Sequence, residues 1–270
     1  SDLIKLGFAD IDGVLRGKYL SLDKFKKVAA GTSGFCDCVL GWDVDDQLYD
    51  SVSFTGWHTA FPDALYKLEL STERMLTDEG VPYFIADFVA GDQESPHSIC
   101  PRSRLKEVLA QAESMGFMPR MAFEFEFFVF DETPHSVREK HYENLTPLSP
   151  GNFGYSVLRN STLSDLFNEF QDYCADHDFP LEGLHCETGP GVWEAAIGVD
   201  DALAAADKAA LFKTFAKVFF QKRGLMATFM AKWSMDYPGQ SGHLHQSLAE
   251  INSRVNVFYD QDAEEQMSQI

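Results

Sequence analysis

The chain has 270 residues, of which 45% are hydrophobic and 24% charged, a composition typical of a soluble globular protein with one large or two ordinary domains. Its formal net charge of −20 argues against nucleic acid or an anionic membrane surface as a partner, because both are bound through clustered lysine and arginine. No run approaches the roughly 20 apolar residues that cross a bilayer, and the N-terminus lacks a signal pattern, so we expect a cytoplasmic protein. The 5 cysteines lack zinc-type spacing and are expected to be reduced thiols.

The N-terminal third predicts strands and ordered loops. Residues 3–20 alternate loosely and carry Asp12-Gly13, a strong hairpin signal, so we expect a pair of strands there. Residues 35–70 are dense in Asp, Trp and Gly and predict short strands and loops, and residues 81–89 predict a further strand.

A connector at residues 91–96 precedes a change in composition, and we place a domain boundary after it, between domains 1–97 and 98–270. A helix is expected to begin at Pro101 and to end at Gly116. One face of this helix is apolar and consists of Leu105, Val108, Leu109 and Ala112.

The rest of the chain intersperses strands and helices, which predicts an α+β fold. The expected elements are a strand at 121–130, a long loop at 131–155, helices at about 161–177 and 200–223, and strands at 225–231 and 241–248.

The stretch from Glu182 to Glu194 is expected to form a strand, a turn and a second strand, because Gly189-Pro190-Gly191 cannot continue a helix or a central strand. The turn folds Glu187 and Glu194 toward one another. Two carboxylates in a partly buried place repel each other unless a proton or a cation intervenes. This stretch therefore predicts one wall of a cation site.

Glu124 and Glu126 lie two apart in the expected strand at 121–130, so their carboxylates point the same way. The other face of the strand is phenylalanine and is expected to be core. The acidic face itself continues into Phe128 and Phe130, unlike an ordinary solvated face. The two glutamates are either a half-exposed surface pair or a pair of cation ligands.

His243-Leu244-His245 places two imidazoles on one strand face after a glycine-rich loop, a pattern open to a metal or phosphate contact or to ordinary surface histidines. Together with the carboxylates at 124, 126, 187 and 194, His243 completes a donor set that suits Mg²⁺ or Mn²⁺ better than zinc or copper. So many donors predict two ions, which chiefly serve phosphoryl transfer and hydrolysis.

Four motifs in this order resemble those of the glutamine synthetase family, in its type I form. They are the segments 123–128 (Phe-Glu-Phe-Glu-Phe-Phe), 185–194 (His-Cys-Glu-Thr-Gly-Pro-Gly-Val-Trp-Glu), 227–232 (Ala-Thr-Phe-Met-Ala-Lys) and 241–248 (Ser-Gly-His-Leu-His-Gln-Ser-Leu). The resemblance covers essentially the whole chain. It implies a small N-terminal β-grasp domain at 1–97 and, at 98–270, a glutamine-synthetase-type catalytic domain with an antiparallel curved sheet and flanking helices.

The resemblance also implies roles for individual residues. Glu126, Glu187 and Glu194 match the ligands of a first metal ion. Glu124 and His243 match two ligands of a second ion, which lies on the ATP phosphates.

Positions that line the nucleotide site in the family are matched by Glu182, Tyr155, His245 and Ser247. Gly239 resembles the glycine that helps to hold the α-carboxylate or amino group of the substrate. Asp63 resembles the acid of the N-terminal domain that reaches a neighbouring subunit's site and helps to bind ammonium.

The implied activity is ATP-dependent joining of L-glutamate to an amine or ammonia through γ-glutamyl phosphate, with two Mg²⁺ or Mn²⁺ ions. Phosphorylation gives the carboxylate a good leaving group, and a nearby carboxylate can accept the extra proton of the amine. A ring-shaped homo-oligomer with sites between subunits is expected by resemblance alone.

Two departures from the family pattern bear on function. The usual ammonium-site run Asp-Gly-Ser-Ser is absent, and the chain instead carries Trp42 and Trp57 in aspartate- and glycine-rich loops. These aromatic residues are more typical of the γ-glutamyl-amine ligase branch, so an organic amine is expected as substrate. Family members also continue beyond the position of Ile270, so we expect a C-terminally truncated catalytic domain.

Two other interpretations stay open at this point. The chain is either an enzyme or a catalytically inactive glutamine-synthetase-like fragment or scaffold. A two-metal phosphohydrolase would explain the ligands but not the ordered motifs.

Overall fold

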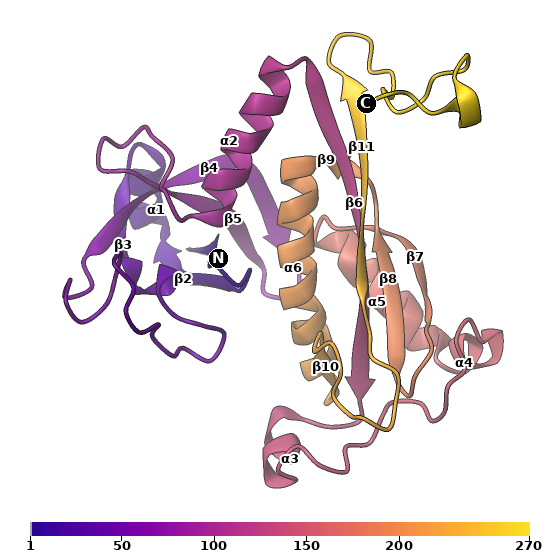
Figure 1. Cartoon of the computed structure of the whole chain (residues 1–270). Coiled ribbons are helices and arrows are strands. Elements are labelled where there is room, and N and C mark those ends of the chain that lie inside the picture. Colours follow the sequence, from indigo (N-terminus) through magenta and orange to yellow (C-terminus); the bar gives the residue numbers. More distant parts are fainter. Residues whose placement is uncertain (1) are drawn as a thin grey trace. The chain divides into compact units, whose positions relative to one another are not determined.

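The computed structural model describes residues 2–270, and the chain divides into two compact units, Ser1–Phe117 and Met118–Ile270 (Figure 1). Each unit combines helices and strands, so the predicted α+β class is confirmed. The division into domains 1–97 and 98–270 stays a prediction.

The first unit is built on a five-stranded sheet with the order β2-β1-β5-β4-β3. Its strands are β1 (Leu3–Ala9), β2 (Leu15–Ser21), β3 (Ser33–Cys36), β4 (Asp63–Leu76) and β5 (Val81–Val89). β1 and β5 run parallel, and the other neighbours run antiparallel. The core on this sheet includes Phe8, Tyr66 and Phe88, and the ring of Phe8 contacts the rings of the other two.

The expected N-terminal strand pair is confirmed as the β1–β2 hairpin. Gly13 at its turn has a φ of +75°, in the left-handed region that favours glycine. The carboxylate of Asp10 closes the turn by accepting hydrogen bonds from the N–H groups of Asp12 and Val14, each at 2.9 Å.

Helices of the first unit are α1 (Leu22–Ala29), the short 3₁₀ helix η1 (Asp37–Leu40) and α2 (Pro101–Ser114). α2 begins at Pro101 as expected, but its apolar stripe is not the face that it buries. Arg102 and Ser103 are buried, whereas Val108 is 60% exposed. The reason is electrostatic, because Arg102 turns toward the sheet and binds the carboxylate of Asp87 on β5 at 2.7 Å.

The second unit is built on a six-stranded sheet centred on β6. The strands are β6 (Phe117–Phe130), β7 (Leu181–Cys186), β8 (Val192–Ile197), β9 (Asp200–Asp201), β10 (Met226–Thr228) and β11 (Gly242–Glu250). The order β10-β6-β8-β7 runs across the sheet, and β9 and β11 also pair with β6. β11 runs beside β6 in the opposite direction (Figure 1).

The helices of the second unit are α3 (Pro134–Glu139), α4 (Val157–Thr162), α5 (Ser164–Asp176), α6 (Ala202–Gln221) and the 3₁₀ helix η2 (Glu264–Gln266). The predicted loop at 131–155 contains α3, where Thr133 caps the helix and Pro134 occupies its first turn. The predicted helix at 161–177 is α5, and it is separated from α4 by the non-helical Leu163.

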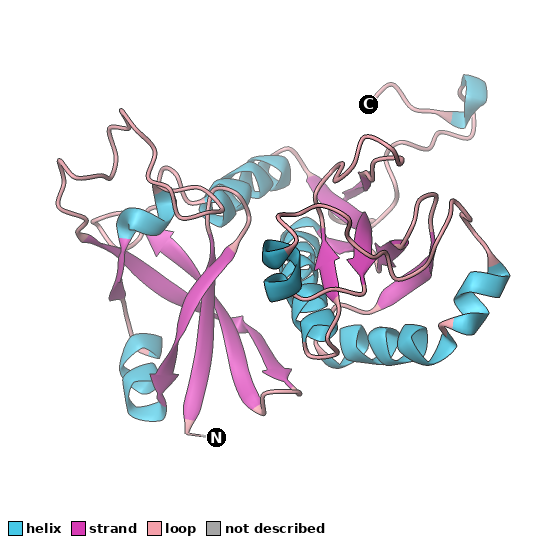
Figure 2. Cartoon of the chain, turned by 90° about the horizontal axis from the view of Figure 1, so that it is seen from below, coloured by secondary structure: helices cyan, strands magenta, loops and turns pink. Residues whose placement is uncertain are grey.

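One face of the second sheet packs on α5 and α6 through aromatic rings. The ring of Phe127 on β6 lies 6.1 Å from that of Phe170 on α5 and 5.9 Å from that of Phe212 on α6. Trp193 on β8 lies 4.1 Å from Phe167. Figure 2 shows these helices gathered on one side of the strands. The other face is therefore left to the alternate, acidic side chains of β6 and β8.

Candidate metal centre

Three neighbouring strands place acidic and imidazole side chains in one row. Glu126 on β6 stands opposite Glu194 on β8, and Glu194 stands opposite His185 on β7. Directly opposed residues share a face of a sheet. The row therefore lies on the face away from the aromatic core.

The turn between β7 and β8 sets the position of Glu187, whose N–H donates to the carbonyl of Val192 at 2.9 Å. Gly191 in this turn has a φ of +69°, and a Cβ at this position would lie 2.4 Å from the carbonyl oxygen of Val129. The carbonyl of Gly191 also accepts a hydrogen bond from the N–H of Val129 at 2.8 Å. Only glycine fits here, and the predicted strand, turn and strand are confirmed.

The first cluster consists of His185, Glu187 and Glu194. Nε2 of His185 lies 3.2 Å from Oε2 of Glu187 and 3.4 Å from Oε2 of Glu194. The three side chains offer ligand atoms within 4.8 Å of one another. Oε1 of Glu187 accepts a hydrogen bond from the N–H of Thr188 at 2.6 Å, which fixes the orientation of the carboxylate.

The second cluster consists of Glu124, Glu194 and His243, again with ligand atoms within 4.8 Å of one another. Oε2 of Glu124 lies 3.4 Å from Nδ1 of His243 and 3.0 Å from Nε2 of His245. Glu194 belongs to both clusters. The two clusters are therefore adjacent parts of one site.

Glu126 lies in the row but in neither cluster, because Ser241 engages both of its carboxylate oxygens. Oε1 of Glu126 accepts from the Oγ of Ser241 at 2.7 Å, and Oε2 accepts from the N–H of Ser241 at 3.0 Å. The N–H of Glu126 donates in turn to the carbonyl of Ser241 at 3.1 Å. These bonds fasten the start of β11 to β6.

The electrostatics of the site follow from burial and from like charges. Burial raises the pKa of the Glu194 carboxyl, and the neighbouring carboxylates raise it further, although His185 partly offsets them. Burial also acts to raise the pKa of Glu187, but hydrogen bonds from Thr188 and the nearby His185 outweigh it and lower the pKa. Glu194 is thus the carboxylate whose charge a cation would relieve most.

Tyr155 and Glu182 lie on different elements, and of the two only Tyr155 has a contact with the first cluster among the described residues. The ring of Tyr155 stacks on that of His185 at 4.4 Å with 12° between the planes, and the N–H of Tyr155 donates to the carbonyl of Cys186 at 2.7 Å. The charge of Glu187, followed by that of Glu194, raises the pKa of the Tyr155 phenol. Glu182 is an exposed residue of β7, on the strand that carries His185.

The other predicted residues lie in three places. His245 and Ser247 follow His243 along β11. Gly239 lies in the loop before β11, where a Cβ would lie 2.8 Å from the carbonyl oxygen of Ala231. Asp63 begins β4 in the first unit, at the strand end paired with Cys36.

Two residues of the site were not predicted. His185 could have been predicted from its spacing. It lies two residues before Glu187, and residues two apart in a strand share a face, as Glu124 and Glu126 do. Ser241 carried no signal of its own, since its bonds to Glu126 arise only from the pairing of β11 with β6.

The donor chemistry fits divalent cations. Carboxylate oxygens with a minority of imidazole nitrogens suit Mg²⁺ or Mn²⁺. Glu124, Glu194 and His243 lie close enough to contact one ion, and Glu187 and Glu194 lie close enough to contact another beside His185. Glu126 is adjacent to these residues. To contact a cation, its carboxylate would give up the hydrogen bonds that it accepts from Ser241.

Comparison with known proteins identifies the family. Residues 98–270 match the family model for the glutamine synthetase catalytic domain. The chain belongs to the glutamine synthetase family. The resemblance stated from the four motifs is confirmed.

Two curated members of the glutamine synthetase family illustrate the range of relatives. The chain is 44% identical over 271 residues to type-1 glutamine synthetase 2 of Dictyostelium discoideum, a match that covers 100% of this chain and 52% of that protein. It is 36% identical over 252 residues to glutamate–isopropylamine ligase of a Pseudomonas species, covering 93% of this chain and 55% of that protein. The chain thus spans about half the length of the curated relatives that it matches.

A solved structure of GmaS without ligand has the same fold. It superimposes with a TM-score of 0.80 at 23% identity and covers 99% of this chain and 58% of that one. Among the described residues, no helix combines the length and apolar character required to span a membrane.

Proposed function

We propose that this chain carries the metal- and nucleotide-binding half of a ligase that joins L-glutamate to an amine at the expense of ATP, through γ-glutamyl phosphate. The observation that carries the proposal is the position of Glu194. This one carboxylate is shared by two clusters of possible ligands on a single sheet face. Because the chain belongs to the glutamine synthetase family, we assign to these two clusters the ligase reaction of that family.

Glu126, Glu187 and Glu194 would hold the first Mg²⁺ or Mn²⁺ ion, and Glu124 and His243 would contribute to the second. When bound, the ions would neutralise charge between the glutamate carboxylate and the γ-phosphate. The chain's own part is to hold these side chains on one rigid sheet face. His185 would act as a positioning residue, because it lies within 3.4 Å of both Glu187 and Glu194.

The remaining roles follow the same proposal. The nucleotide would be bound by Tyr155, which stacks on His185 and is 70% exposed, and by the polar side chains of Glu182, His245 and Ser247. Gly239 would allow the substrate to approach the backbone of a loop that the hydrogen bond from Gln240 to Ala231 holds at 2.8 Å. Asp63 would help to bind the amine, in a homo-oligomer with sites between subunits.

The amine is proposed to be organic rather than ammonia. Trp57 is 84% exposed in the loop before β4 and lies edge-on to Phe61, with ring centroids 5.1 Å apart. An exposed aromatic ring suits the alkyl group of an amine better than it suits ammonium alone. One relative with 36% identity is a glutamate–isopropylamine ligase.

ADP release from ATP by the purified protein tests the function. The assay combines L-glutamate, Mg²⁺ and, in separate reactions, ammonia, methylamine, isopropylamine or ethanolamine. We expect release with at least one organic amine to exceed that with ammonia, and Glu194→Gln to lower it at least ~100-fold. The matched control is Glu113→Gln, an exposed acid of the first unit.

The outcomes separate the alternatives. Efficient turnover with ammonia alone would overturn the choice of an organic amine but leave the ligase proposal standing. Absence of ADP release with every acceptor would favour the inactive scaffold. ADP release that does not depend on glutamate would favour a phosphohydrolase.

A further inference from the structure

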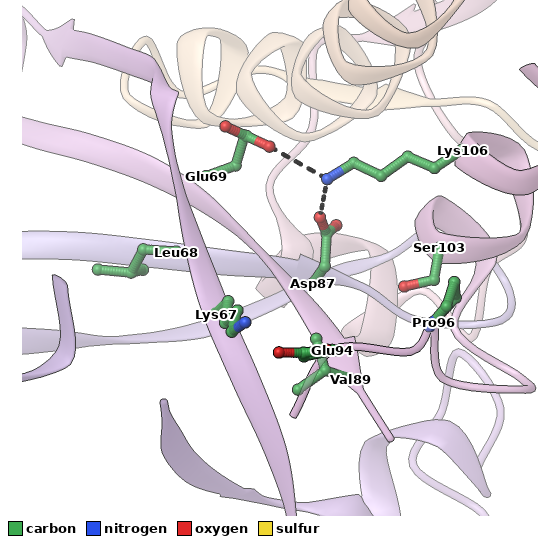
Figure 3. Close-up of a pocket in the computed structure, with 9 residues that line it drawn as sticks. All are labelled: Lys67, Leu68, Glu69, Asp87, Val89, Glu94, Pro96, Ser103 and Lys106. Carbon is green, nitrogen blue, oxygen red and sulfur yellow. Dashed lines mark hydrogen bonds and ion pairs between the residues drawn. The ribbon is translucent and has the colours of Figure 1, made fainter. Parts of the chain in front are cut away.

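The first unit contains a cavity of about 240 Å³ that has no role in the proposed reaction. Its walls come from β4, β5, the loop at 90–96 and the first turns of α2 (Figure 3). Five charged side chains line it, namely Lys67, Glu69, Asp87, Glu94 and Lys106.

At one end of the cavity, both carboxylates are bound by cations. The buried carboxylate of Asp87 binds Nη1 of Arg102 at 2.7 Å and Nζ of Lys106 at 2.5 Å. Nζ of Lys106 also lies 3.1 Å from a carboxylate oxygen of Glu69. Figure 3 shows Lys106 reaching between the two acids. Both carboxylates at this end are therefore already engaged by cations.

The other end holds one free charge of each sign. Lys67 stands opposite Asp87 in the register of β4 and β5, so its side chain lies on the cavity face of the sheet. Glu94 extends from the loop into the same cavity (Figure 3). Over residues 2–270, neither the Lys67 ammonium nor the Glu94 carboxylate has an ion-pair partner.

The loop that carries Glu94 is ordered by its own hydrogen bonds. Oδ1 of Asp92 accepts from the N–H of Glu94 at 3.0 Å and from that of Ser95 at 2.8 Å. The N–H of Ala90 donates to the carbonyl of Ser95 at 2.8 Å, which closes the loop. The backbone of Glu94 is therefore held in place before any ligand arrives.

We propose that this cavity binds a small zwitterion, with its carboxylate on Lys67 and its ammonium on Glu94. A simple anion would meet the carboxylate of Glu94 unpaired, and a simple cation would meet Lys67 unpaired. A molecule with both charges satisfies both partners.

The walls also limit the size and character of the ligand. Val89 and Pro96 also line the cavity and offer contact to a short alkyl group. A volume of about 240 Å³ lies below the ~300–1,000 Å³ of sites for drug-sized molecules. The ligand class is accordingly a small aliphatic α-amino acid, and L-alanine and L-valine are suitable probes.

Saturation-transfer difference NMR on the full chain tests the proposal, in EDTA and without nucleotide. We expect saturable binding of L-alanine and L-valine. Propionate lacks the ammonium and ethylamine lacks the carboxylate, so each should bind at least ~10-fold more weakly. Equal binding of propionate or ethylamine and alanine would overturn the zwitterion assignment. Absence of saturable amino-acid binding would show that Lys67 and Glu94 only pair with each other or with water.

Variants locate the binding. Lys67→Met and Glu94→Gln should each weaken L-alanine binding at least ~10-fold, because each removes one of the two charge contacts. Lys26→Met and Glu73→Gln are matched controls, since both residues are exposed and lie outside the cavity. Unchanged affinity in Lys67→Met would overturn the proposal.

A third variant separates this cavity from the second unit. Glu194→Gln changes the candidate metal centre and should leave L-alanine binding unchanged. Loss of binding in that variant would assign the amino acid to the metal centre and overturn the proposed location.

Discussion

Replacement of Gly191 by alanine tests whether the turn between β7 and β8 positions the side chains of the candidate metal centre. The φ of +69° costs a non-glycine residue about 1–2 kcal/mol. The new Cβ would also lie 2.4 Å from the carbonyl oxygen of Val129, so the backbone must move. That movement strains the hydrogen bond from Val129 to Gly191, which contributes about 1 kcal/mol. The expected loss of unfolding free energy is therefore about 2–3 kcal/mol.

Gly224 provides the matched control. Its φ of +73° is nearly the same, but nothing lies within 4 Å of a Cβ built there. Gly224→Ala should therefore lower the free energy of unfolding only by the cost of the positive φ, about 1–2 kcal/mol.

Urea unfolding followed by circular dichroism measures both losses. The same samples with millimolar Mn²⁺ measure the effect on the site, because the turn positions Glu187 and Glu194. Stabilisation by the metal should be reduced in Gly191→Ala and retained in Gly224→Ala. Equal losses in the two variants, with equal response to Mn²⁺, would refute the argument from close approach.

Three further predictions concern buried charges. Hydrogen bonds from Lys140 and other donors lower the pKa of Glu132 from its ordinary 4.5 to about 2. The contribution of this carboxylate to the free energy of unfolding is therefore complete above pH 4.5 and is lost as the pH falls through 2. Glu132→Gln should lower the free energy of unfolding by about 2 kcal/mol at pH 7 and flatten this part of the curve of stability against pH. Asp87→Asn should cost about 3 kcal/mol in urea unfolding because it removes the buried carboxylate that binds both Arg102 and Lys106, and a loss below about 1 kcal/mol would contradict this. For Glu194, whose pKa is raised, the charged form opposes folding at neutral pH. Glu194→Gln should therefore melt at a higher temperature than the unsubstituted protein in EDTA and at a lower one in saturating Mn²⁺, and a scan without this crossover would count against a shared ligand.

Local signals predicted most strands and the acidic face of the site. The period of two in β6 correctly placed Glu124 and Glu126 on one face, because alternation is a property of the strand itself. Gly189-Pro190-Gly191 likewise marked the turn without knowledge of what surrounds it. The α+β class followed from the interspersed strands and helices, and the family followed from four ordered motifs.

What could not be predicted depends on partners distant in sequence. The orientation of the Glu126 carboxylate is set by Ser241, which is 115 positions away along the chain. The buried face of α2 is decided by Asp87 on β5 rather than by the apolar stripe of the helix. The α3 helix depends on a threonine cap and a proline, which a periodicity-based interpretation treats as loop residues.

The bonds between Ser241 and Glu126 determine which side chains β11 presents to the candidate metal centre. Alternation means that a slip of one residue against β6 would replace the imidazole of His243 by the side chain of Leu244. A residue inserted at 234–240 would lengthen the loop before β11, and His243 and His245 would stay on the same face of the sheet. A residue inserted between Ser241 and His243 would turn both imidazoles to the opposite face, and the response of thermal stability to Mn²⁺ would distinguish the two insertions. Ser241 thus fixes the register of β11 against β6.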